Sequence, residues 1–135
     1  MNSESPSGQG AGVRIRTALL AWPGVTTEPH RFGGIEYRYG RKEMGHVHGD
    51  RLADLPFPRK IHDELIAAGR AQLHHVLPDT GWVSRWISSA DEADDVIALF
   101  RINYDRYSAG APEAGAGTDP EADPEAGSRG PEVQV

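Results

Sequence analysis

The polar segment RKEMGHVHGD, residues 41–50, holds the side chains of this sequence best suited to chemistry. His46 and His48 are separated by one residue, and alternate side chains of a β-strand point to the same face. Two imidazoles placed in this way are a spacing that metal sites use. The pattern lacks a third ligand, because Glu43 would point to the opposite face and Asp54 comes late in the sequence.

His46 therefore has two interpretations. As a metal ligand it would work with His48 in a small metal-assisted enzyme. As a core histidine it would contact Ile35 and Met44 across a hairpin and be satisfied by one hydrogen bond. Without a third ligand the second interpretation is favoured, so we expect no metal site. The sequence identifies no catalytic or cofactor-binding residue, and the cofactor stays unknown.

A second histidine pair, His74 and His75, lies near Trp82. Neighbouring side chains of a strand point apart, so this pair would not share a metal, although one of the two could meet His48 across a sheet. An aromatic pocket could be formed by Trp82, Trp86, Tyr37 and Tyr39. Aromatic side chains more often belong to the hydrophobic core, so we expect these four to be core residues. The candidate binding patch consists of Glu43, His46, His48, His75 and Trp82.

Apolar periodicity predicts the elements that must position these residues. Helices are expected at 13–22, 58–69 and 93–107, where apolar residues recur at intervals of three and four. Strands are expected at 25–30, 35–39, 42–48, 73–77 and 82–88, and residues 49–57 are expected to form a turn and a connector. This order predicts an α+β fold, with a small, mainly antiparallel sheet covered by helices.

A two-residue turn at Gly40-Arg41 would fix the register of the hairpin between residues 35 and 48. It predicts four facing pairs: Tyr39 with Lys42, Arg38 with Glu43, Tyr37 with Met44, and Ile35 with His46. The Arg38–Glu43 pair would be an ion pair of modest strength.

Composition divides the 135 residues into one domain and two tails. Residues 1–12 and 109–135 are rich in Gly, Pro, Ser and acids and poor in large apolar residues, so we expect both to be disordered. They carry the net charge of −6, whereas the core at 13–108 is neutral, which speaks against nucleic acid as a partner. There is no Cys for disulfides and no run of about 18 apolar residues for a membrane span, so a cytoplasmic protein is expected.

Three segments, RKEMGHVHGDRLADLPFP, HHVLPDTGW and RINYDR, carry a resemblance to a known family. Residues 25–107 resemble the luciferase-domain group, small bacterial proteins with fungal relatives. The resemblance supplies no catalytic residues. A flavin-dependent luciferase resembles a (β/α)8 barrel, which needs about 200 residues or more, so the core at 13–108 is too short to be a true flavin luciferase.

Residues 82–107 also faintly resemble the C-terminal half of YjbR-type proteins, which would suggest a nucleic-acid-binding module. Such a module would need a basic stripe, for example Arg38, Arg41, Arg59 and Lys60 on one face. The favoured hypothesis is a binding or accessory domain for an unknown small ligand or protein, with the enzyme as the alternative. Convergence of His46, His48 and His75 in one pocket would favour the enzyme.

Overall fold

The structure, a computed structural model, describes residues 9–30 and 33–110. Most of the two expected tails lies outside these ranges. The first helix begins at Ala11 and the last ends at Ala109, so the ordered elements extend slightly beyond the expected core of 13–108.

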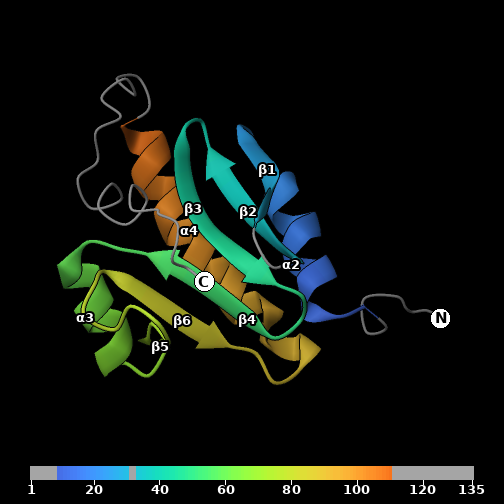
Figure 1. The fold of residues 1–135 in the computed structure, drawn as a ribbon. Coiled ribbons are helices and arrows are strands. Elements are labelled where there is room, and N and C mark those ends of the chain that lie inside the picture. The colour runs from blue at the N-terminus through green and yellow to red at the C-terminus, as the bar shows by residue number, and fades with distance from the viewer. Residues whose placement is uncertain (1–8, 31–32, 111–135) are drawn as a thin grey trace.

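A six-stranded sheet forms the centre of the domain, with the strand order β1-β2-β3-β4-β6-β5 and antiparallel pairing throughout (Figure 1). Its strands are β1 (Val25–His30), β2 (Gly34–Tyr39), β3 (Lys42–His48), β4 (Leu52–Pro56), β5 (Gln72–Leu73) and β6 (Trp82–Trp86). Antiparallel pairing allows one face of a sheet to carry polar residues while the other packs on the core.

The described residues form three α-helices, α2 (Ala11–Leu20), α3 (Arg59–Ala67) and α4 (Ala93–Ala109). Figure 1 shows α2 and α4 on one side of the sheet, while α3 lies at its β5–β6 end. The helix-covered face contains the core, where Leu19, Phe100, Val47 and Val83 are buried. The α+β prediction is therefore confirmed.

Two elements near the candidate site were predicted wrongly. The segment 49–57 is not only a turn and a connector, because it contains β4, which is buried along its whole length. A strand buried on both faces shows no alternation of apolar and polar residues, so its pattern resembles a loop with scattered apolar residues. The strand expected at 73–77 is reduced to β5, so His74 and His75 follow the strand and do not lie within it.

A β-bulge changes the register of the β2–β3 hairpin. Tyr39 faces Lys42 and Arg38 faces Glu43, as predicted, but Tyr37 then faces Gly45 and Ile35 faces Val47. Met44 is the extra residue, and it displaces every later residue of β3 by one position. The predicted Tyr37–Met44 and Ile35–His46 pairs are therefore wrong. The Arg38 side chain binds Glu36 and the carbonyl of Arg41, so the described contacts show no ion pair with Glu43.

Asn103 supports this bulge from helix α4. Its fully buried Nδ2 donates hydrogen bonds to the carbonyls of Met44 and Pro56, at 3.0 and 2.9 Å. A carbonyl at a bulge loses its partner in the sheet and must find another one when buried. Asn103 thus fixes the irregular part of β3 against β4.

Phe100 provides a test of how α4 packs on the sheet. It is fully buried, with its ring edge-on to Tyr37 at a centroid distance of 5.6 Å. Replacing a buried Phe by Ala leaves a cavity, so Phe100→Ala should lower the free energy of unfolding by about 3–5 kcal/mol in urea titrations. Val13→Ala, at a position 49% exposed, should change it by less than about 0.5 kcal/mol. Equal effects of the two substitutions would contradict this packing.

Candidate metal centre

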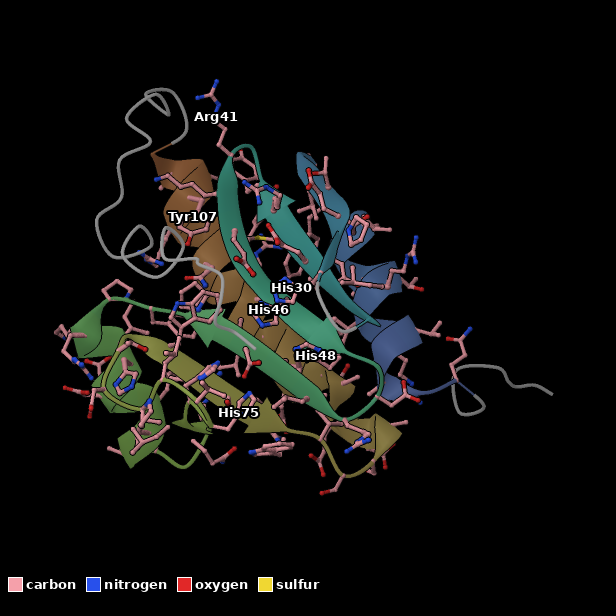
Figure 2. All side chains as sticks on the ribbon, in the orientation of Figure 1. His30, Arg41, His46, His48, His75 and Tyr107 are labelled. Carbon is pink, nitrogen blue, oxygen red and sulfur yellow. The ribbon has the colours of Figure 1, made fainter. Side chains whose placement is uncertain are left out.

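The sheet face opposite α2 and α4, which we call the open face, carries five of the six histidines. In Figure 2 His30, His46, His48 and His75 lie on this face, across β1, β3 and the segment after β5. His74 joins them through its contacts with Asp54 and Trp82. Only His62, on α3, belongs to a different environment. A concentration of imidazoles on one polar face indicates a binding site.

Asp54 lies at the centre of this group. It is the only acidic residue of the buried strand β4, and it is 1% exposed. Its Oδ2 lies 3.3 Å from His46 Nε2, 3.8 Å from His48 Nε2 and 3.4 Å from His75 Nε2. The strand pairing explains the convergence, since Asp54 faces His46 on β3 and Ser84 on β6. One carboxylate oxygen therefore faces three imidazoles from two segments.

The other oxygen of Asp54 is occupied by protein donors. Ser84 Oγ donates to Oδ1 at 2.7 Å, and His74 Nε2 lies 3.6 Å from the same atom. His74 Nδ1 accepts the backbone N–H groups of Val76 and Leu77, so the ring proton of neutral His74 is on Nε2 and points toward Oδ1. These contacts orient Asp54 so that Oδ2 is directed toward the remaining histidines.

Glu43 contacts His46, so its predicted position on the opposite face of the sheet is wrong. His46 Nδ1 donates to Glu43 Oε2 at 2.8 Å, although the two residues are three positions apart in one strand. The bulge at Met44 is the reason, because one extra residue brings Glu43 and His46 to the same face. With its proton on Nδ1, neutral His46 has a free Nε2 lone pair toward Asp54.

His46 also has other neighbours than predicted. Ile35 does not face His46. The His46 ring instead stacks on the His30 ring at a centroid distance of 3.8 Å, and it lies 5.4 Å from the Trp82 ring. His48 lies edge-on to His46 at 5.2 Å and is half-buried. Both histidines therefore belong to a polar cluster and not to the apolar core.

His74 and His75 do not point apart. Their rings stack at a centroid distance of 4.6 Å, and both face Asp54, because they lie in an irregular segment where strand alternation does not apply. Trp82 and Trp86 flank the cluster, with Trp82 next to His74 and Trp86 next to His75. The described contacts place the other predicted aromatic residues elsewhere, Tyr37 against Phe100 and Tyr39 against Tyr104.

The open face thus holds all five residues of the candidate patch, together with four that the patch left out: His30, Asp54, His74 and Ser84. One feature of the sequence could have identified Asp54 as a site residue. It is a lone carboxylate in the apolar run LADLPF, and once that run forms a buried strand the carboxylate needs a partner. No feature of the sequence could have identified His30 and Ser84, because only the order of the strands brings them close to the cluster.

The carboxylates set the charge of the cluster. Burial disfavours the charged form of His46, but its hydrogen bonds to Asp54 and Glu43 outweigh burial and raise its pKa to about 9. Burial also works against ionised Asp54, and His46 nevertheless lowers the pKa of Asp54 to about 2. Burial lowers the pKa of His74 to about 4, and burial together with the charge on His46 lowers the pKa of His48. His48 and His74 are therefore neutral near pH 7.

A surface hollow adjoins the cluster at His48. It has a volume of about 360 Å³, and its lining residues are Gly33, His48, Gly49, Arg51, Leu52 and Trp86. His48 thus contacts both Asp54 and the hollow. A ligand in this hollow could reach the cluster along the open face.

The fold and the site define a small α+β domain with a histidine–carboxylate cluster on the open face of its sheet. Residues 41–103 match the family model described as Luciferase domain, and this match supports a luciferase-domain family protein. The match includes β3, β4 and β6, which carry His46, His48, Asp54 and Ser84. Searches of curated proteins and of solved structures found no match.

The resemblance to YjbR-type proteins is not supported by these comparisons. The basic stripe that would have favoured nucleic-acid binding is also interrupted by acids: Arg38 binds Glu36, Lys60 binds Glu64 and Arg59 binds Asp63. No helix in the two described ranges has both the length and the apolarity to cross a lipid bilayer.

The opposite pKa shifts of His46 and His74 predict how the stability of the metal-free chain depends on pH. Protonated His46 stabilises the fold below its unfolded pKa of 6.5, and this contribution is lost as the pH rises toward 9. Neutral His74 lowers stability as the pH falls from 6.5 toward 4, because only the unfolded chain takes up the proton. Urea midpoints in the presence of a chelator should therefore be highest near pH 6.5.

Substitutions can assign the declines in stability above and below pH 6.5 to individual histidines. His46→Gln should remove the decline above pH 6.5, and His74→Asn should weaken the decline below it. His62→Gln, which alters the histidine outside the cluster, should keep both declines. A profile unchanged by His46→Gln would show that this histidine is not held in its charged form.

Proposed function

We propose that this luciferase-domain protein binds a divalent transition-metal ion through His46, His48 and Asp54, and that the metal acts on a small ligand at the open face. The observation that carries the proposal is the convergence of two imidazole Nε2 atoms on one buried carboxylate oxygen. The ligand atoms of these three residues all lie within 4.8 Å of one another.

The separations suit a transition metal. Zinc lies about 2.0–2.1 Å from its nitrogen and oxygen ligands, so two ligands of a tetrahedral ion are about 3.4 Å apart. The distances from Asp54 Oδ2 to His46 Nε2 and His48 Nε2 are 3.3 and 3.8 Å. An ion could therefore be accommodated by small side-chain rotations, without movement of β3 or β4.

The surrounding contacts suit the same ion. A metal-bound imidazole typically donates its other N–H to a carboxylate, and Glu43 accepts this hydrogen bond from His46. Ser84 gives Asp54 comparable support at Oδ1. The negative charges of Asp54 and Glu43 would balance the two positive charges of the ion, and binding would release the proton that His46 holds in the metal-free chain.

The ligand set also indicates the kind of metal and the kind of role. Two imidazoles and one carboxylate favour zinc, iron(II), cobalt or nickel over calcium or magnesium, which prefer oxygen ligands. Three protein ligands are typical of catalytic sites, because they leave a coordination position for water or substrate. His75, 3.4 Å from Asp54 Oδ2 and 37% exposed, is suited to exchange a proton with a ligand at that position.

This proposal makes metal-assisted chemistry, the alternative in the sequence analysis, the leading function. Two reasons for ranking it second are weakened, since Glu43 shares a face with His46 and Asp54 lies 3.3 Å from His46 Nε2, where it would serve as the third ligand. The role of a ligand-binding domain is retained within it, because the metal would be part of the binding site.

The direct test is the thermal midpoint of the chelator-treated full chain with and without zinc, cobalt or nickel. A ligand at 100 times its Kd stabilises by about 2.7 kcal/mol, which corresponds to a rise of roughly 10–20 °C for a domain of this size. His48→Gln and Asp54→Asn should each abolish the rise, because each removes one of three ligands.

His62→Gln provides the matched control and should keep the full rise, measured against its own metal-free midpoint. A cluster that only stabilises the fold gives another pattern, in which His46→Gln and Asp54→Asn destabilise the chain and no metal raises any midpoint. That pattern, or a rise that survives Asp54→Asn, would contradict the proposal.

Glu43→Gln tests whether Glu43 orients the metal-bound His46 without binding the metal itself. Loss of a carboxylate that orients a metal-bound histidine typically costs about 10–100-fold in metal affinity. Zinc titration with a competing chelator should therefore show weakened binding with unchanged stoichiometry. Unchanged affinity would show that the Glu43–His46 hydrogen bond does not act on the metal.

A further inference from the structure

The hollow beside His48 has the size and composition of a small-molecule site. Its volume of about 360 Å³ falls in the range of roughly 300–1,000 Å³ that ligand pockets occupy. Leu52 and Trp86 supply apolar surface, and the glycines 33 and 49 leave the backbone accessible. Trp86 is 46% exposed, a large apolar surface for a residue at the end of a strand.

Among the described residues of the lining, Arg51 supplies the only cationic side chain. Within the described residues its guanidinium has no ion pair or hydrogen bond, whereas its backbone is fixed at both ends. The Arg51 N–H donates to the carbonyl of His48 at 3.2 Å, and its carbonyl accepts the N–H of Ile87 at 2.8 Å. A fixed backbone with an available guanidinium at the edge of an apolar hollow is suited to an anionic ligand.

We propose that this hollow binds a small monocarboxylate on a flat apolar body, with Arg51 pairing the carboxylate and Trp86 contacting the body. The proposal rests on the proposed function, because His48 borders both the hollow and the metal-binding residues. A ligand held in this way would lie next to the coordination position that the three protein ligands leave open.

The charges of the site specify one negative charge. The carboxylates of Asp54 and Glu43 would balance the metal ion, so among the described lining residues Arg51 alone meets the charge of the ligand. A phosphate would carry nearly two charges to one guanidinium and would place a strongly hydrated group against Leu52 and Trp86. A planar carboxylate matches the fork of Arg, and an aromatic body matches the indole ring.

Isothermal titration calorimetry with 2-naphthoate and its neutral analogue 2-naphthamide tests this inference on the full chain, with and without zinc. The carboxylate should bind at least 10-fold more tightly than the amide. Arg51→Gln should remove this preference, and Trp86→Ala should weaken both compounds. Arg41→Gln is the matched control, since Arg41 lies at the turn between β2 and β3, far from His48 and His75 in Figure 2.

Equal binding of the two compounds, or equal effects of Arg51→Gln and Arg41→Gln, would overturn the assignment of the hollow. The metal proposal is judged separately, from zinc binding to the same variants. Zinc that binds normally to Arg51→Gln while 2-naphthoate does not bind to the wild type refutes only the hollow. Selective 2-naphthoate binding by a chain that binds no zinc supports the hollow and refutes the metal site.

Discussion

The site depends on one buried carboxylate. Asp54 lies in the middle of a strand that is buried along its length, where an ionised group is stable only if it is paired. Ser84 and His74 hold one oxygen, and three histidine nitrogens face the other at 3.3–3.8 Å. This arrangement explains why so many polar residues gather on the open face, and a metal ion would satisfy the same carboxylate without leaving a proton on His46.

A backbone irregularity provides the second condition. Without the extra residue Met44 in β3, Glu43 and His46 would lie on opposite faces of the sheet. Asn103 bonds the Met44 carbonyl from α4, so a polar residue in the core helps to set the geometry of the open face. The helix layer and the candidate site are connected through this contact.

Sequence patterns predicted the parts of this domain that depend on local periodicity. The α+β class, the first helix, the β2–β3 hairpin and the long last helix follow from apolar spacing and turn residues, and the structure has them. Strand β4 could not be found in this way, because burial on both faces removes alternation. The bulge could not be found either, since the hydrogen bond that supports it comes from Asn103, 59 residues later in the chain. Both failures affected the candidate site, where they concealed Asp54 and misplaced Glu43.

The most direct test of the central claim is the nuclear magnetic resonance spectrum of the imidazole nitrogens in the 15N-labelled full chain, before and after one equivalent of zinc. If His46 and His48 bind the metal with Asp54, their Nε2 resonances move to metal-bound positions while their Nδ1 atoms stay protonated. His62 is unaffected, and His74 keeps its proton on Nε2. The account is contradicted if His46 and His48 do not respond, or if His62 responds as strongly as they do.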